Sequence, residues 1–88
     1  MSKITFAEDA WKEYLYWQSQ DKKTLKKINS LLRSVQREPF TGEGKPEPLK
    51  NSPEGEWSRR INDKDRLVYR VSDEGITVTQ CKGHYNDR

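Results

Sequence analysis

The sequence predicts one α+β domain over residues 1–88, with an N-terminal strand and two helices packed on one face of a twisted, mainly antiparallel sheet. Three observations lead to this fold class. Apolar residues recur at helical spacing in the first half of the chain. Three runs with β-branched or aromatic residues follow in the second half, separated by turn sequences. A chain of 88 residues has room for a single hydrophobic core.

The first part of the chain is expected to form a strand and then a helix. Residues 3–6 predict the strand, and Thr5 followed by Glu8 fits a capping box at the start of the helix. This helix is predicted to end near residue 19 or 20. At about 100° per residue, one broad face collects the side chains of Ala7, Ala10, Trp11, Tyr14, Leu15 and Trp17.

A second helix is expected to begin after Asp21, a favourable N-cap residue, and to end before Pro39. Its apolar face spans an arc of roughly 120° and contains Leu25, Ile28, Leu31, Leu32 and Val35. Its other side is basic and contains Lys22, Lys23, Lys26, Lys27, Arg33 and Arg37. A solvated helix surface and a contact with RNA are equally open interpretations of this basic side.

A loop rich in glycine and proline is expected over residues 40–55. Pro46 and Pro48 flank Glu47, and each proline fixes its own φ and restricts the residue before it. The loop therefore presents the Glu47 carboxylate on a stiff, extended segment. The alternative interpretation is an ordinary exposed carboxylate.

Three strands, over residues 56–61, 66–71 and 76–82, complete the expected sheet, with turns at 62–65 and 72–75. The face without helices would be free to carry chemistry. With a four-residue hairpin loop, Arg60 and Arg66 would point to opposite faces of the sheet. Both would reach one cleft only if a bulge intervened or Arg66 lay in the bend.

Charge and composition narrow the possible classes of function. The formal net charge is +3, which favours an anionic partner such as nucleic acid, an acidic protein or a membrane surface. The single cysteine, Cys81, allows no intramolecular disulfide and favours a reduced, cytoplasmic setting. No apolar run is long enough to span a membrane, and the N-terminus lacks the apolar core of a signal peptide, so we expect a soluble protein.

The only histidine, His84, suggests acid–base chemistry, because imidazole exchanges protons near neutral pH. Metal-free RNA cleavage needs a base for the 2′-OH, an acid for the leaving 5′-oxygen, and cations for the charged phosphorane. Glu47 is assigned as the base, His84 as the acid, and Arg66 as the group that stabilises the transition state. The roles of Glu47 and His84 could be exchanged, or the ribosome could supply one of the two groups. Supporting contacts to phosphates and to a base are assigned to Lys50, Arg60 and Tyr85.

Other reactive residue types are given structural roles. Arg59 is interpreted as an exposed strand residue that pairs with Asp or Glu. Cys81 is interpreted as a small buried residue, because no neighbour in the sequence would lower the pKa of its thiol. One cysteine and one histidine exclude the usual zinc-binding spacings, and no phosphate-binding glycine motif is present, so no metal or cofactor is expected.

Six segments, over residues 11–17, 21–29, 44–50, 57–61, 66–69 and 84–85, resemble in order and spacing the YoeB (Txe) toxins, part of the RelE-like superfamily of bacterial toxin–antitoxin systems. The resemblance implies a RelE-like microbial RNase fold and a ribosome-dependent endoribonuclease that cuts messenger RNA in the A site of the 30S subunit, inhibiting translation. It also implies a homodimer and a cognate YefM-type antitoxin.

The same resemblance assigns roles by matched motif. Glu47 takes the position of the general base, Arg66 the phosphate-stabilising position, and His84 the general-acid position. Tyr85 takes the position of the terminal tyrosine, and Lys50 and Arg60 match the supporting basic residues. The family pattern closes on that tyrosine, whereas residues 86–88 continue past it here, so a free terminal carboxylate beside the site is not expected.

Two further classes of function remain open. The chain could be a non-catalytic basic module that binds RNA or the ribosome and blocks translation by occupancy. It could also be a protein-interaction module whose basic surface receives an acidic partner.

Overall fold

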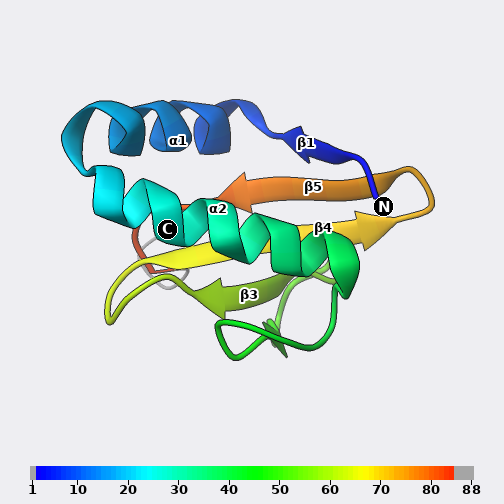
Figure 1. Ribbon diagram of the computed structural model, residues 1–88. Helices are drawn as coiled ribbons and strands as arrows, with labels where there is room; N and C mark the ends of the chain where they lie inside the picture. The colour runs from blue at the N-terminus through cyan, green and yellow to red at the C-terminus, as the bar shows by residue number, and fades with distance from the viewer. Residues whose placement is uncertain (1, 85–88) are drawn as a thin grey trace.

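The computed structural model describes residues 2–84 and shows two helices packed on one face of a five-stranded sheet (Figure 1). The elements in chain order are β1 (Ile4–Phe6), α1 (Glu8–Gln20), α2 (Lys22–Arg37), β2 (Glu47–Pro48), β3 (Trp57–Arg60), β4 (Arg66–Ser72) and β5 (Gly75–Gln80). The strand order is β1-β5-β4-β3-β2, with β1 parallel to β5 and the other neighbours antiparallel. The predicted fold class is confirmed.

The capping box predicted at the start of α1 is wrong. Thr5 lies inside β1 opposite Thr77 of β5, and the N-cap of α1 is Ala7, which makes no side-chain capping bond. The amide of Ala7 donates to the carbonyl oxygen of Val78 at 2.9 Å. Pairing with β5 therefore continues up to the helix, and Thr5 lies too early in the chain to cap it.

The apolar face predicted for α1 is only partly buried. Ala10 and Trp17 belong to the core, whereas Trp11 and Leu15 remain 47% and 40% exposed. The Trp11 ring stacks on Tyr14 with a centroid separation of 5.7 Å. The ribbon of α1 lies beside the β1 edge of the sheet (Figure 1), and Trp11 also contacts the edge strand through Phe6, at a centroid separation of 5.6 Å.

The predicted N-cap, end and core face of α2 are confirmed. The Asp21 carboxylate accepts hydrogen bonds from the Thr24 amide at 3.2 Å and the Thr24 hydroxyl at 2.8 Å, and these bonds lower the pKa of Asp21. The helix ends at Arg37, and Glu38 is extended, as a following proline favours. The core face of α2 is fully buried at Ile28, Leu31 and Val35.

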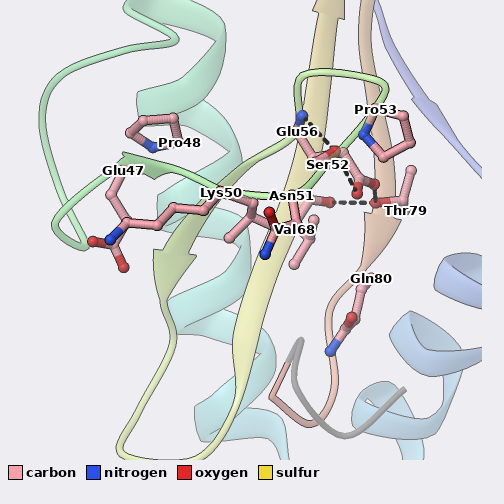
Figure 2. Close-up of a pocket in the computed structure, with 11 residues that line it drawn as sticks. Glu47, Pro48, Lys50, Asn51, Ser52, Pro53, Glu56, Val68, Thr79 and Gln80 are labelled. Atoms are coloured by element: carbon pink, nitrogen blue, oxygen red, sulfur yellow. Dashed lines mark hydrogen bonds between the residues drawn. The ribbon is translucent and has the colours of Figure 1, made fainter.

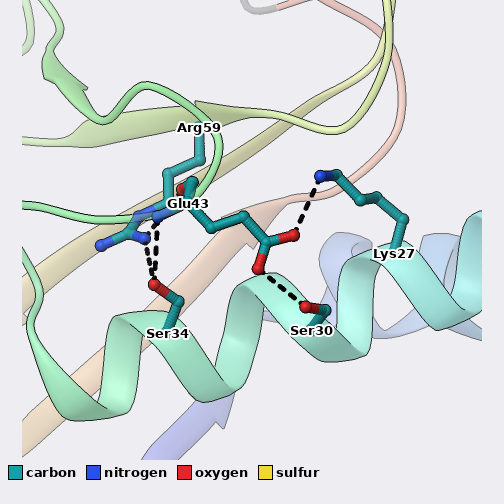
Figure 3. Close-up of polar contacts among 5 residues, drawn as sticks. All are labelled: Lys27, Ser30, Ser34, Glu43 and Arg59. Atoms are coloured by element: carbon teal, nitrogen blue, oxygen red, sulfur yellow. Dashed lines mark hydrogen bonds and ion pairs between the residues drawn. The ribbon is translucent and has the colours of Figure 1, made fainter.

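The interpretation of Arg59 as an exposed strand residue is wrong. Its side chain is 0% exposed and points toward α2 (Figure 3). The guanidinium and Nε donate five hydrogen bonds of 2.7–3.1 Å, to the Tyr69 and Ser34 hydroxyls and to the carbonyls of Glu38, Thr41 and Glu43. Arg59 therefore satisfies backbone carbonyls that the loop after α2 would otherwise leave without partners.

Glu43 fixes the same loop to α2 from the other side (Figure 3). Its carboxylate accepts a hydrogen bond from Lys27 at 2.9 Å and from the Ser30 hydroxyl at 2.7 Å. These two bonds, that of Lys27 first, lower the pKa of Glu43. One lysine of the basic side of α2 is thus paired within the chain.

The expected loop over residues 40–55 is interrupted by β2, which confirms the extended conformation predicted for Glu47. The expected conflict between Arg60 and Arg66 does not arise, because these residues are direct partners in the β3–β4 register. Residues 61–65 form the connection, one residue longer than expected. Direct antiparallel partners project to the same side, so both arginines lie on one face.

Cys81 is fully buried, as expected for a small core residue. Among residues 2–84, no helix has the length and apolar character needed to cross a membrane.

Candidate functional site

A row of side chains crosses the face of the sheet opposite the helices. In the register, Glu47 pairs with Ser58, Ser58 with Val68, and Val68 with Gln80. Arg59 and its partner Leu67 point to the helices, so this row lies on the other face, which we call the open face. The open face is therefore the one that also carries Arg60 and Arg66.

Glu47 and Arg66 lie two strands and two residues apart on the open face. Strand spacing of about 4.8 Å and a rise of about 3.3 Å per residue give a Cα separation of about 12 Å. The register places both residues on this face, and the Arg66 Nη1 is bonded to carbonyls of the preceding turn. The Glu47 side chain is exposed and available to a ligand.

A cavity of about 670 Å³ adjoins Glu47 on this face (Figure 2). Lys50 also lines it, so the structure places two of the predicted site residues at one cavity. Val68, Thr79 and Gln80 of the sheet line its other part, together with residues 48–53. The cavity is thus open to a ligand that also contacts Glu47.

Glu56 holds the loop that lines this cavity, a role that the sequence did not indicate. Its carboxylate accepts hydrogen bonds from the Thr79 hydroxyl at 2.6 Å and the Ser52 hydroxyl at 3.3 Å (Figure 2). Thr79 lies near the irregularity between β4 and β5, where the register shifts at Val68 and Tyr69. No local pattern in the sequence marks such a shift.

Arg66 begins β4 and is buried, with the residue only 8% exposed. Its Nη1 donates to the carbonyl oxygens of Asn62 at 2.7 Å and Asp65 at 3.1 Å. Its backbone amide donates to the carbonyl of Gly83 at 2.9 Å, which draws the segment after β5 alongside the start of β4. The guanidinium is therefore oriented by the turn before any ligand binds.

His84 directly follows Gly83 and is half-buried. The structure thus brings the backbone next to His84 against Arg66, while Glu47 lies farther along the open face. Arg60 is exposed beside Arg66 as its direct register partner. Tyr85 lies outside the described residues.

The described residues offer acid–base groups and fixed cations. Among residues 2–84, no group of three or more His, Cys, Asp or Glu side chains could hold a metal ion. A carboxylate and arginines on one face, with an imidazole on the segment bonded to the start of β4, are residue types suited to proton transfer around an anionic substrate.

Residues 6–85 match the model of a protein family described as "YoeB-like toxin of bacterial type II toxin-antitoxin system". The chain belongs to this family. It is 49% identical over 83 residues to toxin YoeB of Escherichia coli K12, covering 94% of this chain and 99% of that protein. It is 51% identical over 83 residues to toxin YoeB of Synechocystis, covering 94% and 96%.

Solved structures agree with membership of the YoeB family. The YoeB dimer from Staphylococcus aureus matches with a TM-score of 0.89 and 49% identity, covering 96% of this chain and 98% of that one. YoeB in the YoeB–YefM complex from the same organism matches with a TM-score of 0.86 and 48% identity, covering 97% and 99%. An archaeal RelE–RelB complex from Pyrococcus horikoshii, at 19% identity and a TM-score of 0.73, shows the same fold, as predicted.

Proposed function

We propose that this YoeB-family toxin is a ribosome-dependent endoribonuclease that cleaves messenger RNA in the 30S A site and thereby inhibits translation. The observation that carries the proposal is the composition of the open face. Glu47, Arg60 and Arg66 share this face by strand register, and the segment that bears His84 is bonded to the start of β4. A base, an acid and fixed cations are the groups that metal-free RNA cleavage requires.

In the proposed reaction, the RNA supplies its own nucleophile. Glu47 takes the proton of a 2′-OH, and the 2′-oxygen forms a bond to the adjacent phosphorus. The bond from phosphorus to the 5′-oxygen breaks, and His84 protonates that leaving oxygen. The products are a 2′,3′-cyclic phosphate and a free 5′-hydroxyl, and no redox or metal chemistry is involved.

The cations of the site stabilise the charge that develops on the phosphorane. Arg66 is the central group, because its guanidinium is already oriented by the carbonyls of Asn62 and Asp65. Arg60 and Lys50 hold flanking phosphates on either side, and Tyr85 stacks on a base. A guanidinium stays protonated throughout the reaction, so Arg66 acts by charge and geometry and transfers no proton.

The proposed partners follow from the relatives. The S. aureus structures contain a YoeB dimer and a YoeB–YefM complex. For this chain we propose a homodimer in the cytoplasm that is neutralised by a cognate YefM-type antitoxin.

The test is cleavage of a defined messenger RNA on purified ribosomes, with 5′ ends mapped by primer extension. Glu47→Gln, His84→Gln and Arg66→Lys are each expected to lower the single-turnover cleavage rate by about 10²–10⁴-fold. Two matched controls, Glu74→Gln in an exposed turn and Arg70→Lys farther along β4, are expected to cleave like the wild type. Full cleavage by the first three variants would overturn the proposed site.

A pH–rate profile assigns the two proton transfers. Replacing His84 is expected to remove the alkaline limb, and replacing Glu47 the acidic limb. Loss of the opposite limbs would show that the two roles are exchanged. Arrested translation with intact messenger RNA would overturn the nuclease proposal in favour of a non-catalytic module that blocks the ribosome by occupancy.

A further inference from the structure

The segment that follows β5 is held by hydrogen bonds along its backbone. The Cys81 amide donates to a carboxylate oxygen of Glu13, and its carbonyl accepts from the Trp17 indole, each at 2.8 Å. The Gln80 side-chain amide donates to the carbonyls of Lys82 and Gly83, each at 3.0 Å. The position of the residue next along the chain, His84, is therefore set by contacts with the folded domain.

Asp65 links this segment to Arg66 through its side chain, in addition to the direct bond between the Arg66 amide and the Gly83 carbonyl. The residue is 2% exposed, and its carboxylate accepts a hydrogen bond from the Gly83 amide at 2.7 Å through Oδ1. Its backbone carbonyl accepts from the Arg66 guanidinium at 3.1 Å. One buried residue thus contacts both the neighbour of His84 and the guanidinium of Arg66.

The carboxylate is itself fixed by the turn that precedes β4. Asn62 donates from Nδ2 to Asp65 Oδ2 at 3.0 Å, and the Asp65 amide donates back to Asn62 Oδ1 at 2.8 Å. The bond from Gly83 is charge-assisted, and such bonds are roughly twice as strong as neutral ones. Gly83 has φ +80°, a left-handed conformation that glycine adopts without strain.

We propose that Asp65 is a positioning residue for the cleavage reaction. By holding the Gly83 amide, it fixes the position of His84 relative to Arg66. The proton donor and the phosphate-stabilising cation then keep a constant distance and orientation. This inference rests on the proposed function of His84 and Arg66. Asp65 is nearly inaccessible to solvent and acts through Gly83, so it is not a catalytic residue.

The size of the expected effect follows from the geometry. Without the carboxylate, the Gly83 amide loses its acceptor, and the backbone adjoining His84 is then held through the Gly83 carbonyl, which still accepts from the Arg66 amide and the Gln80 side chain. A displacement of about 1 Å in a reacting group costs up to about 100-fold in rate. Asp65→Ala is therefore expected to lower kcat about 10- to 100-fold, with KM close to the wild-type value, because the RNA-binding cations are unchanged.

Asp65→Asn and Asp63→Asn form a matched pair, because both remove one negative charge from the same turn. Asp65→Asn retains a side-chain oxygen for the Gly83 amide but loses the charge, and it is expected to lower kcat about threefold to tenfold. The Asp63 side chain is exposed, and its replacement is expected to leave kcat unchanged. The assay uses the full-length chain with programmed ribosomes and saturating messenger RNA.

A second measurement needs no ribosome. His84 is the only histidine, so its imidazole signals in a ¹H–¹³C spectrum need no assignment. Asp65→Ala and Asp65→Asn are expected to shift or multiply these signals, and Asp63→Asn to leave them at the wild-type positions. If Asp65 only stabilised the turn, an Asp65 variant with an unchanged thermal midpoint would leave the His84 imidazole signals at their wild-type positions.

The outcomes separate the two proposals. Absence of cleavage by the wild type refutes the proposed function, whereas the imidazole signals still test the link through Gly83. Wild-type cleavage with equal kcat for the Asp65 and Asp63 variants, and with unshifted imidazole signals, overturns the positioning role. If Asp65→Ala does not fold, the comparison of Asp65→Asn with Asp63→Asn decides the question alone.

Discussion

Arg59→Met tests how much of the stability of the fold depends on the buried guanidinium. The substitution keeps an unbranched apolar side chain beneath α2 and removes all five hydrogen bonds. The Tyr69 hydroxyl still donates to the Pro39 carbonyl at 2.6 Å, and the Ser34 hydroxyl still accepts from the Glu43 amide at 3.3 Å. The main loss therefore falls on three loop carbonyls.

The magnitude follows from those three carbonyls. Hydrogen bonds to a charged donor contribute about 1.5–3 kcal/mol each, which gives a gross loss of about 4–9 kcal/mol. Burying the guanidinium costs free energy in the wild type, and removing it recovers part of that cost. We expect a net loss of about 3–5 kcal/mol, within the range seen when one partner of a buried charged contact is removed. The total free energy of unfolding of a domain of this size is only about 4–13 kcal/mol.

The assay is urea unfolding followed by the fluorescence of the three tryptophans, with thermal unfolding in parallel. At about 4–8 °C per kcal/mol, the thermal midpoint is expected to fall by at least about 12 °C. Arg60→Met is the matched control, since the neighbouring side chain is exposed, and its effect is expected to stay within about 0.5 kcal/mol. A loss below about 1 kcal/mol for Arg59→Met would refute the reasoning.

Two further predictions concern α2. The pKa of Glu43 is lowered in the folded state, so its contribution to stability is complete above its ordinary pKa of 4.5 and disappears as the pH falls through the lowered value. Urea midpoints of Glu43→Gln are therefore expected to fall less than those of the wild type between about pH 6 and about pH 3, and an equal fall would contradict this. Asp21→Ala is expected to lower the thermal midpoint and Asp21→Asn to preserve it, since asparagine also caps helices; equal midpoints would contradict the capping role.

The predictions that succeeded depend on local patterns. Asp21 and Pro39 mark the start and the end of α2 through contacts and restrictions within a few residues. The apolar spacing of its core face follows from the helical period alone. The prediction from Thr5 and Glu8 failed because parallel pairing with β5, more than 70 residues away in the chain, determines the conformation of Thr5. Such long-range pairing leaves no trace in a window of a few residues.

The role of Arg59 could not be predicted for a related reason. Its acceptors are mostly backbone carbonyls of a loop that closes around it, and carbonyls have no sequence signature. Asp65 was taken only as part of a turn, although its carboxylate binds Gly83, 18 residues later. The roles of Glu47, Arg66 and His84 were inferred from residue chemistry and then matched to a family motif, and they stay predictions until cleavage is measured.

Adjacent arginines on β3 are divided between the two faces of the sheet by the two-residue period of a strand. Arg59 points to the helices and closes the loop before β2, whereas Arg60 points to the open face. Whether Arg66 joins Arg60 depends on the length of the connection between β3 and β4. The Asn62 side chain accepts hydrogen bonds from the amides of Lys64 and Asp65, and these bonds stabilise a connection with an odd number of residues, 61–65. A connection with an even number of residues would turn Arg66 toward the helices, so this turn chemistry determines which cations face a ligand on the open face.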